Sequence, residues 1–256
     1  GATWELRATT GPSARVAPAM AYDIAHKTVV LMGGSIEGFD SWETWTWDGN
    51  AWELRSEGDP GPRSHHGMVY DSARARVVLF GGQVRSHTAK DTWEWDGQSW
   101  ERRADTGPSY RKALAMAYDN VRGRTVLFGG KDDGKPIGET WEWDGRAWSQ
   151  VPGPEPRSGH ALVYDRARGQ FLLQGGSIGE QDDDLAVGTW LWNGDLWEYR
   201  FGGPGPRYGL ALAYDRAREQ VVLFGGRGGA IYHDTWLWNG ASWDYATGEG
   251  PTHRWG

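Results

Sequence analysis

Short apolar runs alternate with polar turns along the whole chain, and no stretch repeats with a helical period. The clearest example lies between Tyr70 and Trp100. Residues 77–80 form an apolar, β-branched run that ends at a glycine pair, and residues 92–95 alternate with a period of two. Both patterns are typical of β-strands. The chain is therefore expected to be all-β.

The unit recurs five times. Its Tyr-Asp pair begins at Tyr22, Tyr70, Tyr118, Tyr164 and Tyr214. Its glycine pair returns at spacings of 48, 48, 46 and 50 residues. A period near 50 indicates one supersecondary unit per repeat, which must stack on its neighbours to bury its faces.

Each repeat contains four expected strands. Asp96-Gly97, replaced by Asn193-Gly194 and Asn239-Gly240 in later repeats, is a strong signal for a two-residue hairpin. Trp100 then begins a fourth strand. Four strands per unit is typical of a propeller blade. The sequence thus predicts a single five-bladed β-propeller of four antiparallel strands per blade, in one domain over residues 1–256.

The two ends of the chain resemble each other. Residues 1–15 match residues 240–254, so both ends offer a fourth strand. Six blades would need 24 strands and the sequence supplies 21, which favours five blades. The tight Asn239-Gly240 turn favours the hairpin that contains Trp243. The strand at Trp4 is expected to add outside that hairpin or to exchange between molecules, giving a monomer or a strand-exchanged dimer.

The glycine pair, the Thr-Trp-x-Trp-Asp-Gly segment and Pro156-Arg157-Ser158-Gly159-His160 resemble the kelch repeat. The resemblance covers essentially the whole chain and implies a propeller. Kelch repeats serve unrelated functions, so function has to be argued from a site. With no cysteine, a copper centre like that of galactose oxidase is excluded, because it needs a cysteine linked to a tyrosine. The iron-binding spacing of nitrile-specifier proteins is also absent.

Charge and tryptophan content narrow the choice of partner. A net charge of −7 argues against nucleic acid and anionic membranes as partners. No apolar run reaches 18 residues, so a soluble protein, cytoplasmic or secreted, is expected.

The repeat accounts for all but two of the 18 tryptophans, Trp42 and Trp255. Trp93, Trp141 and Trp236 are expected to be buried between blades, and Trp42 to lie near a ligand.

Charged residues at constant repeat positions are interpreted as scaffold. An arginine stands seven residues before each tyrosine, and an acidic residue precedes most Thr-Trp pairs, with Gly188 as the exception. Five-fold recurrence favours bonding between blades. His26 replaces an arginine in the first turn and is interpreted in the same way.

The loops that vary most connect the second strand to the third and the fourth to the next blade. Variable loops on a rigid scaffold are where binding residues gather. The candidates for binding a small molecule, a glycan or a protein are Trp42, Tyr110, Lys131, Tyr208 and Arg227.

Histidines on the same face suggest a second hypothesis. The candidate ligands for a divalent metal are His66, His160, His87 and His233. Imidazole and carboxylate groups suit zinc, manganese or calcium, and such a metal could activate water. The two open functions are thus a binding scaffold and a metal-dependent hydrolase of small esters, lactones, phosphoesters or phosphotriesters. His66 and His160 also match a structural kelch histidine, and the Asp182–Asp184 run is expected to be a solvated loop more than a calcium site.

Overall fold

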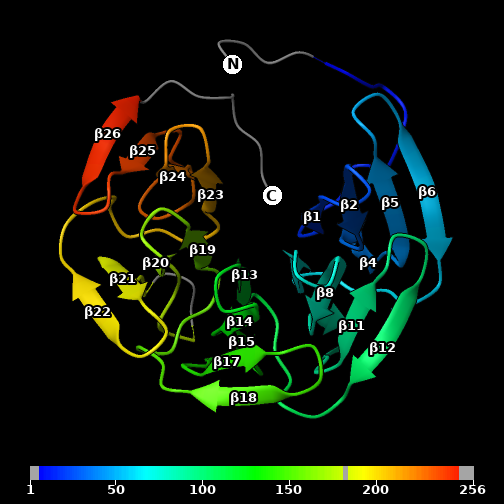
Figure 1. Cartoon of the computed structure of the whole chain (residues 1–256), viewed down its shortest axis with the longest axis horizontal. Helices are drawn as coiled ribbons and strands as arrows, with labels where there is room; N and C mark the ends of the chain where they lie inside the picture. Colours follow the sequence, from blue (N-terminus) through cyan, green and yellow to red (C-terminus); the bar gives the residue numbers. More distant parts are fainter. Residues whose placement is uncertain (1–5, 181–183, 248–256) are drawn as a thin grey trace.

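The computed structural model describes residues 6–180 and 184–247, and these form five four-stranded antiparallel sheets (Figure 1). The sheets stand as blades around a central channel, with the first strand of each blade innermost. The described residues contain only strands, turns and loops, and hence no helix able to cross a membrane. The predicted five-bladed, all-β propeller is confirmed.

The strands of each blade follow one another along the chain. Blades 1 and 2 consist of β1 (Ala19–Asp23), β2 (Thr28–Met32), β5 (Glu43–Trp47) and β6 (Trp52–Glu57), then β7 (Gly67–Asp71), β8 (Arg76–Phe80), β11 (Thr92–Trp95) and β12 (Trp100–Ala104). Blades 3 and 4 consist of β13 (Ala115–Asp119), β14 (Arg124–Phe128), β17 (Thr140–Trp143) and β18 (Trp148–Val151), then β19 (Ala161–Asp165), β20 (Gln170–Gln174), β21 (Thr189–Trp192) and β22 (Trp197–Arg200). Blade 5 consists of β23 (Ala211–Asp215), β24 (Gln220–Phe224), β25 (Thr235–Trp238) and β26 (Trp243–Thr247).

Three blades carry an additional small hairpin in the loop between their second and third strands. These are β3 (Ser35–Ile36) with β4 (Phe39–Asp40), β9 (Gln83–Val84) with β10 (His87–Thr88), and β15 (Lys131–Asp132) with β16 (Lys135–Pro136). We call the end of the propeller that carries these hairpins the loop face, and the opposite end, with the turns between first and second strands, the turn face.

The turns form where the sequence supplies the right residues. In blade 2, Asp96 Oδ1 accepts hydrogen bonds from the backbone N–H groups of Gln98 and Ser99, both at 2.8 Å. Gly97 between them has φ 101°, a value that L-residues rarely adopt. The hairpin of β25 and β26 also forms, as predicted. The proposed partner strand around Trp4 lies outside the described residues.

The core lies between blades rather than inside them. Four apolar clusters each join one blade to the next, and the largest fully buried side chains include the second tryptophan of the third strand, namely Trp95, Trp143, Trp192 and Trp238. Trp93, Trp141 and Trp236 were predicted to be buried between blades, and the structure buries them only in part. These side chains are half-buried, because each indole N–H donates to an acidic residue near the surface: Asp91, Glu139 and Asp234.

The recurrent arginines bond inside their own blade. Arg63 Nη1 lies 2.9 Å from Asp91 Oδ1, and Arg207 Nη1 lies 2.6 Å from Asp234 Oδ1. The expectation that these pairs connect blades was therefore wrong: they tie the lead-in segment of a blade to its own third strand. Arg157, whose partner position is Gly188, is buried, and burial lowers its pKa to about 10.

Other hydrogen bonds connect neighbouring blades, and three examples follow. The backbone N–H of Gly34 donates to the carbonyl of Arg63, and the indole N–H of Trp100 donates to Thr44 Oγ1 at 2.9 Å. The hydroxyl of Tyr118 accepts from the backbone N–H of Ala73 at 3.2 Å. Burial, together with a hydrogen bond to Asp71, raises the pKa of Tyr118 to about 12. We call this tyrosine contact the latch.

The five blades meet at four interfaces of this kind. Their inner strands pack in the order β1, β7, β13, β19 and β23, and no comparable packing joins β23 to β1. In Figure 1, β1 and β23 stand apart at the upper side of the ring. We call the two facing surfaces of blade 5 and blade 1 the seam.

Candidate functional site

The five predicted binding residues are distributed over three blades. Trp42 follows β4 in blade 1 and is 49% exposed. Tyr110 precedes blade 3, where the ammonium group of Lys90 lies 5.0 Å from its ring centroid. Lys131 pairs through its backbone with Lys112, and Tyr208 pairs in the same way with Arg227 in blade 5. The structure therefore holds these residues on several blades and does not join them in one cluster.

A chain of backbone hydrogen bonds at the loop face joins the lead-in segments of the five blades in order, from blade 1 to blade 5. The N–H of His65 donates to the carbonyl of Ala17 at 3.0 Å, and the N–H of Ala113 donates to the carbonyl of His65 at 2.9 Å. Gly159 and Gly209 continue the series at 2.9 Å each. All five residues have positive φ, from 51° at Ala17 to 64° at Gly159. Such strain in non-glycine residues persists only where the surrounding structure imposes it, so this mouth is rigid.

His66 and His160 lie buried in two different interfaces. A β-carbon at Gly33 of blade 1 would lie 3.0 Å from Cε1 of His66, and one at Gly129 of blade 3 would lie 2.6 Å from Cε1 of His160. His160 Nε2 lies 3.2 Å from the carbonyl oxygen of Phe128, to which it can donate. Burial lowers the pKa of both imidazoles to about 3, so both are neutral near pH 7.

The four histidines proposed as metal ligands do not converge. His87 is exposed with Nδ1 3.1 Å from Ser86 Oγ, and His233 is half-buried in blade 5. Within residues 6–180 and 184–247, no three His, Asp or Glu side chains lie close enough to hold one metal ion. The metal-dependent hydrolase stays a prediction. Asp182 and Asp183 fall outside the described residues.

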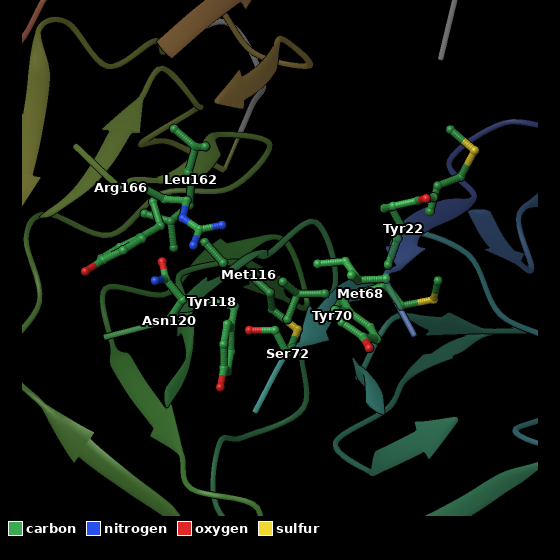
Figure 2. Close-up of a pocket in the computed structure, with 16 residues that line it drawn as sticks. Tyr22, Met68, Tyr70, Ser72, Met116, Tyr118, Asn120, Leu162 and Arg166 are labelled. Carbon is green, nitrogen blue, oxygen red and sulfur yellow. The ribbon is translucent and has the colours of Figure 1, made fainter. Parts of the chain in front are cut away.

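A pocket of about 340 Å³ opens at the turn-face end of the channel (Figure 2). It is lined by the inner strands of four blades and the turns that follow them. Its apolar walls consist of side chains two residues before each repeat tyrosine: Met20, Met68, Met116 and Leu162. Three of the protein's four methionines therefore line this one pocket.

Polar groups lie along one side of the pocket. Ser72, Asn120 and Arg166 occupy the same place in successive repeats, two residues after the tyrosine. Asn120 and Arg166 lie beside each other in Figure 2, across the pocket from Tyr22 and Met68. Asn120 Oδ1 is buried without a hydrogen-bond partner, and the Arg166 side chain beside it is exposed.

Sequence reasoning missed this pocket. It treated the turn residues as scaffold and looked for function on the loop face. The available signal was variation at a fixed offset, because the position two residues after each tyrosine reads Ile24, Ser72, Asn120, Arg166 and Arg216. A constant Tyr-Asp pair followed by a variable residue indicates a rigid turn whose variable side chain is a candidate for binding.

The fold defines the class: this chain is a five-bladed β-propeller with a pocket between the inner strands of four blades. Comparison with protein-family models gives no match, and comparison with the curated proteins gives none either. The chain is therefore assigned here to a fold and to no family.

Proposed function

We propose that the protein is a kelch-type ligand-binding scaffold that holds a small molecule with an apolar body and an anionic group at the turn-face end of its channel. The pocket formed by four inner strands carries this proposal. The kelch-type assignment is supported by the glycine pairs and the Thr-Trp-x-Trp segments of the repeats.

The pocket has the size and lining of a small-molecule site. Its volume of about 340 Å³ is within the range of ligand pockets, which are mostly apolar with a few polar groups. Methionine side chains adapt to irregular shapes and make favourable contacts with aromatic rings. Met68 and Met116, with Tyr22 close by, suit a flat, apolar ligand.

The polar side of the pocket selects the charge of the ligand. Arg166 can offer its guanidinium to an anionic group, since a planar guanidinium pairs well with carboxylate or sulfonate. Asn120 Oδ1 needs a donor, because a buried acceptor without a partner lowers stability. A ligand that carries both an anionic group and an N–H or O–H donor would satisfy both residues.

The fluorescent dye 8-anilinonaphthalene-1-sulfonate is a suitable probe, because it has an aromatic body, an N–H group and a sulfonate. We expect saturable binding to the full chain, and we expect Arg166→Glu to weaken the binding about tenfold, since a favourable contact becomes repulsive. Arg216→Glu is the matched control: Arg216 occupies the same repeat position in blade 5 but does not line the pocket.

Equal affinities for the wild type and Arg166→Glu would contradict the proposal. So would a loss of binding with Arg216→Glu alone, because that result would place the dye near blade 5. Trp42→Ala should leave dye binding unchanged, since Trp42 lies in the loop of blade 1 at the other end of the propeller.

The loop face is a second candidate surface, for a protein or glycan partner. The observation in its favour is that Phe39 and Trp42, three residues apart, are both exposed aromatic side chains. Exposed aromatic residues and arginines are enriched at sites where proteins bind one another. Tyr110, Lys131, Tyr208 and Arg227 would extend this surface across the other blades.

A further inference from the structure

We propose that the seam between blade 5 and blade 1 is a docking surface for one more blade-like β-sheet with this chain's own repeat pattern. The proposal extends the four established blade interfaces, which show what each face of a blade binds.

Among residues 6–180 and 184–247, no element packs on the apolar blade 1 side of the seam. Met20 is 58% exposed, whereas Met68 and Met116, at the same repeat position, are 9% exposed. Tyr22 is 53% exposed, whereas Tyr118 is buried. Trp47 is also only half-buried, although its counterparts in the other four blades are fully buried. In the other blades this face packs on the preceding blade.

On the blade 5 side of the seam, side chains are also more exposed than their counterparts in other blades. Phe224 is half-buried, whereas Phe80 and Phe128 are completely buried at the same position. The Asp215 side chain is 23% exposed, whereas the Asp71 side chain is 2% exposed beneath the latch tyrosine of the next blade. Among the described residues, each face therefore lacks contacts that a neighbouring blade provides inside the ring.

The hydrogen-bonding groups of the seam define the chemistry of the missing partner. On the blade 5 face, the Gly226 N–H has no acceptor among the described residues, whereas the same N–H in the other blades donates to an arginine carbonyl of the next blade. The Asp215 carboxylate lies at the position where Asp71 receives the hydroxyl of Tyr118. The blade 1 face offers the Tyr22 hydroxyl and the Ala17 N–H, which elsewhere meet an Asp–Ala turn and a backbone carbonyl.

These requirements favour a sheet with this repeat pattern over a second intact copy of the chain. One segment must present an arginine carbonyl and a tyrosine on one side, and an aspartate turn and an apolar second strand on the other. Each repeat of this chain has both sets in one sheet. A sheet inserted between blade 5 and blade 1 would bury both apolar faces at once and form two interfaces of the existing kind.

The test uses the full chain and a synthetic peptide of residues 107–151, which spans the lead-in and four strands of blade 3. The peptide carries a fluorescent label, and binding is followed by anisotropy and by its stoichiometry. We expect saturable binding of one peptide per chain. A peptide with Tyr118→Phe should bind about fivefold more weakly, because it lacks the hydroxyl that completes a latch on Asp215.

Two variants of the full chain locate the binding. Met20→Glu places a charge on the blade 1 face and should weaken peptide binding at least about tenfold, since a carboxylate would be buried without a partner. Leu196→Glu is the matched control, because Leu196 is 61% exposed in the turn between β21 and β22, away from the seam. Both substitutions are at exposed positions, so both variants should fold.

Three results would overturn the proposal. The first is no binding of the peptide to the full chain. The second is equal binding by wild type and Met20→Glu. The third is that the chain alone forms a dimer and that Met20→Glu dissociates this dimer. That result would show that the seam binds a second copy of the chain, as strand exchange would also require.

Discussion

The repeat position that His66 and His160 occupy can hold either a histidine or an apolar residue in this fold. The same place in blades 3 and 5 holds Leu114 and Leu210, which are also buried. All four side chains fill space against the glycine pair of the preceding blade. The histidines are therefore packing residues that carry a titratable ring into an interface.

Their burial makes the stability of the protein depend on pH. The pKa of each ring is about 3 in the fold and about 6.5 in the unfolded chain, so the unfolded state binds more protons between these values. Stability should therefore fall as the pH falls below 6.5. From pH 7 to pH 5 the loss is about 2 kcal/mol for each histidine.

The double variant His66→Leu, His160→Leu should lose less stability over this pH range than the wild type, by about 4 kcal/mol for the two rings together. Urea unfolding at pH 7 and pH 5 measures the difference. Leucine is a conservative choice, because it occupies the same position in blades 3 and 5. An identical pH dependence in both proteins would show that these rings are not buried and neutral.

Trp95 and Trp42 represent the two environments of tryptophan in this protein. Trp95 is fully buried between blades 1 and 2, and Trp42 is half-exposed. Trp95→Ala should lower the free energy of unfolding by about 3–5 kcal/mol because it leaves a cavity. Trp42→Ala should change it by less than about 0.5 kcal/mol. Denaturant titration compares the two, and comparable losses would mean that Trp42 is part of the core.

At the scale of the element, the tyrosine latch joins blade 1 to blade 2 through Tyr70 and Ala25, and blade 2 to blade 3 through Tyr118 and Ala73. The Tyr118 hydroxyl satisfies Ala73 N–H and Asp71 in the preceding blade, whereas Tyr22 faces the seam. Tyr118→Phe leaves both partners without the hydroxyl and should cost about 1–2 kcal/mol. Tyr22→Phe should cost close to nothing. Thermal unfolding of the two variants checks this, and a similar cost for both would indicate a latch at the seam.

The strands could be predicted because their signals are local. An apolar run ended by two glycines and an Asp-Gly turn specify β8 and the hairpin of β11 and β12 almost by themselves. The partners of the charged residues could not be predicted in this way. Arg63 pairs within its own blade because its lead-in segment bridges to β9 of that blade through Ser64 and Gln83, and that path depends on contacts far along the chain.

The binding residues were harder to predict for the same reason. Met116 and Asn120 look like strand and turn residues in a single repeat, and they become a pocket only when four blades place them around one axis. The loop residues Trp42 and Arg227 attract attention in the sequence because they break the repeat. A repeat analysis therefore detects variable loops more readily than a cavity that the repeats build together.

At the scale of the whole molecule, the propeller is a row of five like units with four like interfaces. Blades 2, 3 and 4 each pack on two neighbours, whereas blades 1 and 5 each pack on one. In such an arrangement stability is close to a sum over units and interfaces, so the outer units are the least stable. The exposed faces of blades 1 and 5 are the physical basis of the proposed docking surface.

The most direct test of the open seam uses the absence of cysteine from the sequence. Val29→Cys and Val77→Cys each introduce one thiol at the same repeat position, on the seam face of blade 1 in one case and inside the interface of blades 1 and 2 in the other. Val29 is half-buried and Val77 is fully buried, and neither lines the pocket. Maleimide labelling under native conditions should modify the thiol at position 77 at least about a hundredfold more slowly than the thiol at position 29, because the buried thiol reacts only after local opening. Equal slow labelling at both positions would contradict the account, because it would mean that blade 5 and blade 1 close the ring.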